Sequence, residues 1–486
     1  MLATLKFDTE DIYYPPEFRI DDIPGWLARI MTEVGVTGTF CTFGEKARTM
    51  KDRGRDDVLT AMAAHDLVSH LQGNGRPLLP EIVAEAEWDD GVAAMRAFED
   101  KVAEDFRYGF GSDPVGLSRH NLYWAPQHVA VAGERHLPYM SNLLGVPGTE
   151  QPCWYAGTLT MPCTTTPGFG GFDAIYSCDD AFNARLAKMD EHVAACVERG
   201  VEYISLFGCH PVQVMARGWI EEYCLAGGQT RTPEQVGWRY GVRGREDEAR
   251  AKANFRRLCE YIHNHPDLDN VGIAEAARAF STQPPTITRD ELTAYAADVQ
   301  AADRVVLHRT FSPAELLTGM LESLAAAGAA GDLPDAVDRR DVLGPKDMPT
   351  VGREATEVTH AELLDLAREA AGVIKATGHL PANVHLADAR VGIGQLAVLA
   401  ARAYLAQSRY DRYAVLRLSK TTRYPDIAAD IDRRVREAVT EHWPYDPDIQ
   451  SEKIAKHARL QTWTLKPAWL TPPRGRVCHD GRIVLA

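Results

Sequence analysis

Residues 3–11 read ATLKFDTED, a short apolar run that ends in three carboxylates. Further along the chain, residues 65–74 read HDLVSHLQGN, with a histidine at each end of a second apolar run. Between them, residues 38–47 read GTFCTFGEKA, which predicts a strand running into a helix. A strand that ends in acids, followed by a histidine-containing loop, is a common way to assemble a divalent-metal site that activates water. The sequence therefore predicts an α/β fold with a metal site at the ends of its strands.

The three segments, in this order and spacing, resemble the opening motifs of the polysaccharide deacetylase family, the NodB-homology type of carbohydrate esterase family 4. That family has an aspartate in its first strand, an "ATFF"-type second strand and a histidine-rich loop. The resemblance implies a distorted (β/α) barrel over residues 1–283. It also implies metal-dependent removal of an N-acetyl or similar acyl group from a sugar or glycan.

The resemblance assigns a role to each residue at a matching position. Asp8 matches the catalytic base. The acid that holds the metal falls at Glu10 or Asp11, and Glu10 is preferred. His70 matches the first ligand histidine, whereas the position of the second is occupied by Asn74. A neutral amide oxygen is a weaker ligand for zinc than imidazole, so the implied divalent-metal site, for which zinc is the expected ion, is weakened there.

A third motif is expected in residues 118–126, SRHNLYWAP. The resemblance implies that Arg119 orients the base, and a cation beside Asp8 would keep that carboxylate ionised. Tyr123 and Trp124 are expected to offer flat apolar faces to a sugar ring.

A fourth motif ends at His210, in the run YISLFGCHP of residues 203–211. The resemblance implies that His210 is the acid that protonates the leaving amine. The carboxyl end of a barrel strand faces the active site, and a histidine can donate a proton near neutrality.

The pattern of residues 1–283 alternates short apolar runs with amphipathic stretches, which is typical of βα units around a parallel sheet. The predicted strands are 3–7, 38–43, 67–70, 116–122, 157–162 and 203–208, and the predicted helices are 25–34, 81–106, 180–199 and 245–265.

A domain boundary is expected at the polar, proline-rich residues 281–286. Residues 284–486 form a mostly helical region with two related helical segments, at about 288–326 and 358–406. Within the second, residues 374–384 resemble a pseudomurein-binding repeat, a small cell-wall-associated module. A helical hairpin that simply packs on the barrel is the alternative.

Charge and composition restrict the partners. The net charge of −15, with no basic stretch to offset it, argues against nucleic acid. No run of about 18 apolar residues is present, so no membrane span is expected. The first residues show no export signal and the nine cysteines have no regular spacing, which favours a cytoplasmic protein, although action at the cell surface is not excluded.

Two other functions stay open at this point. One is a metal-independent hydrolase of C–N bonds in small amides, as in the allantoinase relatives of the family. The other is a glycan- or cell-wall-binding protein without catalysis.

Overall fold

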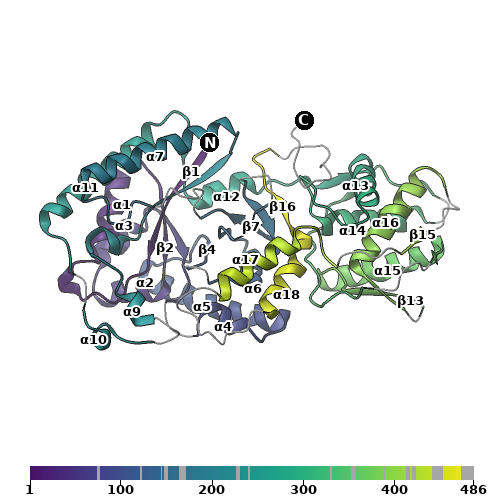
Figure 1. Ribbon diagram of the computed structural model, residues 1–486, viewed down its shortest axis with the longest axis horizontal. Helices are drawn as coiled ribbons and strands as arrows, with labels where there is room; N and C mark the ends of the chain where they lie inside the picture. Colours follow the sequence, from purple (N-terminus) through teal and green to yellow (C-terminus); the bar gives the residue numbers. More distant parts are fainter. Residues whose placement is uncertain are drawn as a thin grey trace.

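In the described residues, ten strands form one curled sheet in the N-terminal part of the protein (Figure 1). The computed structural model describes residues 1–73, 77–120, 123–143, 145–146, 151–163, 171–225, 230–238, 241–328, 331–351, 357–387, 389–411, 416–418, 423–440 and 452–471. The strands of the sheet are β1 (Leu2–Thr9), β2 (Gly38–Thr42), β3 (Asp66–Ser69), β4 (Leu117–Ser118), β5 (Tyr139–Met140), β6 (Cys153–Tyr155), β7 (Thr158–Met161), β8 (Tyr203–Cys209), β9 (Asp269–Asn270) and β16 (Lys466–Pro467).

The strand order is β16-β6-β7-β5-β4-β3-β2-β1-β8, with β9 beside β1. The run from β7 through β5, β4, β3, β2 and β1 to β8 is parallel, and only β6 runs antiparallel to its neighbours β7 and β16. The carboxyl ends of the parallel strands therefore lie along one edge.

Helices cover the outside of this sheet (Figure 1). They are α1 (Asp22–Val34), α2 (Gly44–Asp52), α3 (Asp56–Met62), α4 (Leu79–Val83), α5 (Trp88–Phe110), α6 (Pro126–Glu134), α7 (Asp179–Glu198), α8 (Pro211–Met215), α9 (Glu221–Leu225), α10 (Pro233–Val236), α11 (Arg245–Asn264) and α12 (Ile273–Phe280), with a 3₁₀ turn η1 (Pro16–Phe18). The predicted distorted (β/α) barrel followed by a mostly helical region is confirmed.

Strand β1 directs charged side chains into the barrel. Side chains alternate between the two faces of a strand. Phe7 points outward, where its ring stacks on Phe40 at 5.1 Å and meets the edge of Phe255 in α11 at 5.8 Å. Lys6 and Asp8 therefore point inward, and both are buried.

The C-terminal region contains a second core built from four helices (Figure 1). They are α13 (Arg289–Ala302), α14 (Pro313–Ala327), α15 (His360–Thr377) and α16 (Ile393–Ser408). The short strands here are β10 (Thr286–Thr288), β11 (Ala336–Asp338), β12 (Glu357–Val358), β13 (Asn383–Leu386), β14 (Ala389–Gly392) and β15 (Leu416–Arg417). None of the helices in the ranges given above is long and apolar enough to cross a membrane.

The two predicted helical segments are built in the same way. Helices α13 and α14 are flanked by the antiparallel pair β10–β11, and α15 and α16 by the antiparallel pair β12–β15. Helix α13 packs on α16, and α14 packs on α15, so the two helix pairs interlock. The resemblance of the second segment to a pseudomurein-binding repeat stays a prediction.

The chain returns to the barrel after the four helices. Helices α17 (Ala428–Thr440) and α18 (Glu452–Gln461) lie between the two cores (Figure 1), and a 3₁₀ turn η3 (Thr462–Thr464) leads into β16. Ile431 and Ile454 share a buried cluster with Val129 of α6, and β16 pairs with β6. The division of the chain at residue 283 remains a proposal, and these contacts refine it by placing the last helices and strand against the barrel.

A buried ion pair joins the two parts. The Lys466 ammonium of β16 lies 2.6 Å from the Glu315 carboxylate near the start of α14, and Arg339 lies 2.8 Å from the same carboxylate. Burial lowers the pKa of Lys466, and Glu315 offsets that shift only in part. Glu315 therefore serves two cations, of which Arg339 also pairs with Asp341.

We expect Glu315→Gln to destabilise the protein by about 3–5 kcal/mol, because it leaves a buried ammonium without a counter-ion. Glutamine still caps α14 through Ser312, so the helix start is kept. Lys466→Met should cost less, because Glu315 keeps Arg339. Chemical denaturation measures both, with Asp89→Asn as the control, since its pair with Lys346 is exposed and worth at most about 1 kcal/mol. Equal losses for the three variants would contradict the asymmetry.

Candidate active site

Five acids and histidines converge where the parallel strands end. Asp8 and Glu10 come from the end of β1, His70 follows β3, His120 follows β4 and His210 follows β8. The strand order places β1 between β2 and β8, and the carboxyl ends of parallel strands form the usual ligand crevice of such sheets. Four of these residues line one pocket of about 190 Å³ (all but Glu10), together with Lys6, Arg119, Asn142, Cys163 and Phe207.

Glu10, His70 and His120 form a group that could hold a metal ion. Their candidate ligand atoms all lie within 4.8 Å of one another. The Oε2 atom of Glu10 is 2.9 Å from Nε2 of His120 and 3.4 Å from Nε2 of His70. Two imidazoles and one carboxylate are a ligand set found in catalytic zinc sites.

The protonation states of His70 and Glu10 favour the binding of a cation. Burial lowers the pKa of His70, and the carboxylates of Asp8 and Glu10 only partly offset it, so the ring is neutral at physiological pH. Burial would raise the pKa of Glu10, but His120 and His70 outweigh burial and hold it well below its ordinary value. A neutral imidazole and an ionised carboxylate are the forms that bind metals.

Asp8 is paired within its own strand. The ammonium of Lys6 lies 2.7 Å from Oδ1 of Asp8, and both side chains are buried. Burial opposes ionisation of Asp8, but Lys6, His70 and His210 outweigh it and lower its pKa. The carboxylate is therefore ionised, as a base must be.

His210 is oriented from behind by Asp173. The Oδ2 atom of Asp173 lies 3.0 Å from Nδ1 of His210, and Oδ1 accepts a hydrogen bond from the backbone N–H of His210 at 2.6 Å. The other ring nitrogen, Nε2, faces Glu10 at 3.6 Å and Asp8 at 3.8 Å. Burial would lower the pKa of His210, but Asp173 and the two site carboxylates raise it to about 9.

The structure places the remaining predicted residues as follows. Arg119 lines the pocket, although the cation at the Asp8 carboxylate is Lys6. Asp11, the alternative to Glu10, lies in the electrostatic environment of Lys46 and Asp21 instead of the histidines, and burial raises its pKa to about 6. Asn74 lies outside the described residues, so its predicted ligand role stays a prediction.

The expected aromatic platform is wrong. Tyr123 and Trp124 are 1% and 0% exposed and belong to the core under α6. Helix α6 starts immediately afterwards, at Pro126. Two aromatic rings that contact His210 are those of Phe207 and Trp219, whose centroids lie 4.9 Å and 4.8 Å from that of the imidazole.

Three residues of the candidate site escaped the sequence analysis. His120 stands next to Arg119 in a motif that was assigned to the orientation of the base. Lys6 precedes Asp8 by two residues, the interval that puts both on one face of a strand. Asp173 follows a glycine-rich stretch. Of the three, only Lys6 could have been found from the sequence, through its spacing of two residues from Asp8.

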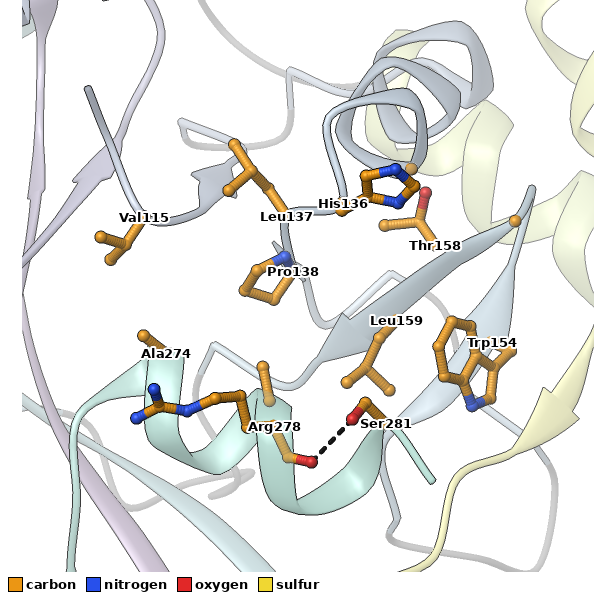
Figure 2. Close-up of a pocket in the computed structure, with 13 residues that line it drawn as sticks. Val115, His136, Leu137, Pro138, Trp154, Thr158, Leu159, Ala274, Arg278 and Ser281 are labelled. Carbon is orange, nitrogen blue, oxygen red and sulfur yellow. Dashed lines mark hydrogen bonds between the residues drawn. The ribbon is translucent and has the colours of Figure 1, made fainter. Parts of the chain in front are cut away.

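A larger pocket of about 440 Å³ lies at the opposite end of the strands (Figure 2). Residues that precede β5 and begin β7 line it, with α12 on the other side. Figure 2 shows Pro138 and Leu159 in its centre, flanked by Arg278 and Trp154. Among the described residues that line it there is one histidine, His136, and no carboxylate.

No known protein-family profile matches the chain, and no curated protein sequence matches it. Solved structures with a similar arrangement include a protein assigned as a polysaccharide deacetylase from Mycobacterium smegmatis, at 15% identity over 59% of this chain and 93% of that chain, with a TM-score of 0.37. The PuuE allantoinase is similar at 12% identity over 57% of this chain and 89% of that chain, with a TM-score of 0.36. A family 4 acetyl xylan esterase from Clostridium thermocellum, in complex with a cobalt ion, is similar at 11% identity over 42% of this chain and 88% of that chain, with a TM-score of 0.24. These values are too low to assign a function to this chain.

We expect His120→Ala to weaken zinc binding by at least about 100-fold, since changes to outer-shell partners alone cost roughly 10–100-fold. Competition with a chromophoric chelator measures the affinity. His136→Ala is the matched control, because His136 is exposed at the opposite end of the strands and should leave zinc affinity unchanged. Equal affinity of the His120 variant and the wild type would remove His120 from the ligand set.

Proposed function

We propose that this protein is a metal-dependent hydrolase that removes an N-acetyl or related acyl group from a sugar or glycan. The observation that supports it most is the convergence of Glu10, His70 and His120 beside an ionised Asp8 and a protonated His210. Hydrolysis of an amide near neutral pH needs these parts: a ligand set for a Lewis acid, a base and an acid.

Glu10, His70 and His120 would hold the metal. A divalent cation bound there would lower the pKa of a water molecule and polarise the carbonyl of the amide. The donor set fits zinc, because two imidazoles are available to a borderline-soft ion. Asn74 is not needed to complete this three-residue ligand set. In this proposal the metal site is therefore not weakened by the asparagine.

Asp8 would act as the base. Its carboxylate lies at the rim of the ligand group, 3.6 Å from His70, and is positioned to take a proton from water. Lys6 keeps it ionised, which favours the form that accepts the proton. The same ion pair also makes Asp8 a weak base. Such a base takes a proton more readily from a water molecule whose pKa is lowered.

His210 would act as the acid on the leaving nitrogen. Asp173 only accepts hydrogen bonds, so Nδ1 of His210 carries a proton and Nε2–H is directed into the site. An imidazolium facing two carboxylates can give up its Nε2 proton to an amine that forms between them. Trp219 packs against the ring and offers an aromatic face beside it, and apolar sugar faces suit such a surface.

The test is the release of acetate from N-acetylated hexosamine oligosaccharides. We expect turnover to stop after removal of metal with a chelator and to return when zinc is added. Asp8→Asn should lower kcat by about 10²–10⁴-fold, the usual contribution of a general base. Full activity in metal-free protein would favour the metal-independent C–N hydrolase instead.

Asp8→Asn has a structural cost, because it leaves the Lys6 ammonium buried without its partner. The double variant Lys6→Met with Asp8→Asn should recover stability, measured by chemical denaturation, and stay inactive. Recovery of activity in the double variant would show that the loss came from misfolding and that Asp8 is not the base.

Asp173→Asn tests the acid. Asparagine can still accept the Nδ1–H of His210, but the charge that raises the pKa of His210 is lost. The pKa of His210 should therefore fall, and less of the required imidazolium is present at a given alkaline pH. We expect the alkaline limb of the kcat profile to move to lower pH, while the acidic limb, which reports the base, stays in place. An unmoved alkaline limb would exclude His210 as the acid.

A further inference from the structure

The ring of His70 is held from behind by Ser118, the last residue of β4. Nδ1 of His70 lies 2.7 Å from Oγ of Ser118, and the same Oγ donates to the backbone carbonyl of Ser69 at 3.0 Å. Both side chains are buried. The ring of Phe43 stacks on His70 with centroids 5.7 Å apart and planes inclined by 22°, which fixes the plane of the imidazole.

The directions of these hydrogen bonds follow from counting protons. A serine hydroxyl has one proton, and a carbonyl oxygen can only accept. We assign the proton of Ser118 to the carbonyl of Ser69, and the short contact with His70 is then donated by Nδ1–H. In a neutral imidazole this leaves Nε2 with a lone pair instead of a proton.

The distances around the other nitrogen agree with this assignment. Nε2 of His70 lies 3.4 Å from Glu10 and 3.6 Å from Asp8. A good N–H···O bond has its heavy atoms about 2.7–3.2 Å apart. The contacts between Nε2 and the two carboxylates are therefore longer than a good hydrogen bond, whereas both bonds of Ser118 lie in the normal range.

We propose that Ser118 is a positioning residue, which holds His70 in the Nδ1-protonated form and so presents Nε2 to the metal. Metal-bound histidines usually donate their other N–H to a carboxylate, a carbonyl or water. Here a serine hydroxyl takes that place and passes the bond on to a backbone carbonyl. The metal part of this inference rests on the proposed function, while the position of the proton does not.

A buried network keeps the accepting carbonyl in place. The hydroxyl of Ser69 donates to Glu99 at 3.0 Å, and His128 donates from Nε2 to the other carboxylate oxygen at 2.8 Å. The hydroxyl of Tyr139 then lies 3.1 Å from Nδ1 of His128. All four side chains are fully buried, so Ser69 is anchored from α5, α6 and β5. A movement of the carbonyl that Ser118 needs would break this network.

Zinc affinity is the first test. Ser118→Ala should weaken zinc binding by roughly 10–100-fold, the range for loss of a histidine's outer partner. Ser118→Thr keeps the hydroxyl and suits a strand, so it should bind zinc like the wild type. Thr318→Val is the matched control, because it removes another buried hydroxyl that donates to a backbone carbonyl, that of Ala314 in the helical region. Unchanged affinity in Ser118→Ala would overturn the proposal, as would equal losses in the Ala and Thr variants.

The second test does not depend on metal. Long-range ¹H–¹⁵N spectra of histidine-labelled, metal-free protein show which nitrogen of each ring carries the proton, and the His70 signal is the one lost in His70→Asn. We expect the proton on Nδ1 in the wild type and a loss of this preference in Ser118→Ala. A proton on Nε2 in the wild type would overturn the proposal even if zinc binds. If the wild type binds no zinc, the metal-dependent function fails, and this spectrum still decides the role of Ser118.

Discussion

The inward face of β1 carries Lys6 and Asp8, and Glu10 follows at its end. These charges cannot be buried without partners, since an unpaired ion in a protein interior costs several kcal/mol. Lys6 and Asp8 satisfy each other at 2.7 Å within the strand. Glu10 depends on His120 and His70, which follow different strands. The order of β1 to β4 in the sheet is therefore also a condition for keeping a carboxylate in the core, and the candidate metal group is a consequence of that condition.

A buried charge is also paired at the other edge of the sheet. Strand β16 brings the buried Lys466 beside β6, and Glu315 of the helical region neutralises it. Between the helical region and β16, helices α17 and α18 pack against α6. The helical region thus contributes a strand and a counter-charge to the barrel, in addition to its own core. These contacts join a region of different composition and periodicity to the barrel.

Much of the fold was predictable, because β1, β2, β3, β7 and β8 have apolar runs long enough to show a pattern. Strands β5, β6, β9 and β16 have two or three residues each, which is too short for any periodicity. The predicted helix over 81–106 is divided into α4 and α5, since the apolar pattern continues through the break at residues 84–87. At the site, Asp8, Glu10, His70 and His210 were assigned from the family resemblance and lie at or just after predicted strands, and the structure brings them together.

The sequence by itself determined the alternation of β1, the strand-end acids and histidines, and the change to a helical texture after residue 283, because these depend on residues close together in the chain. Only the tertiary structure decided which distant groups meet. His120 meets Glu10 although β3 and β2 separate β4 from β1. Asp173 contacts His210 although α7 and β8 lie between them in the chain, and Ser118 meets His70 across the β3–β4 pair. Such contacts are set by strand order and register, and no local pattern of residues encodes them.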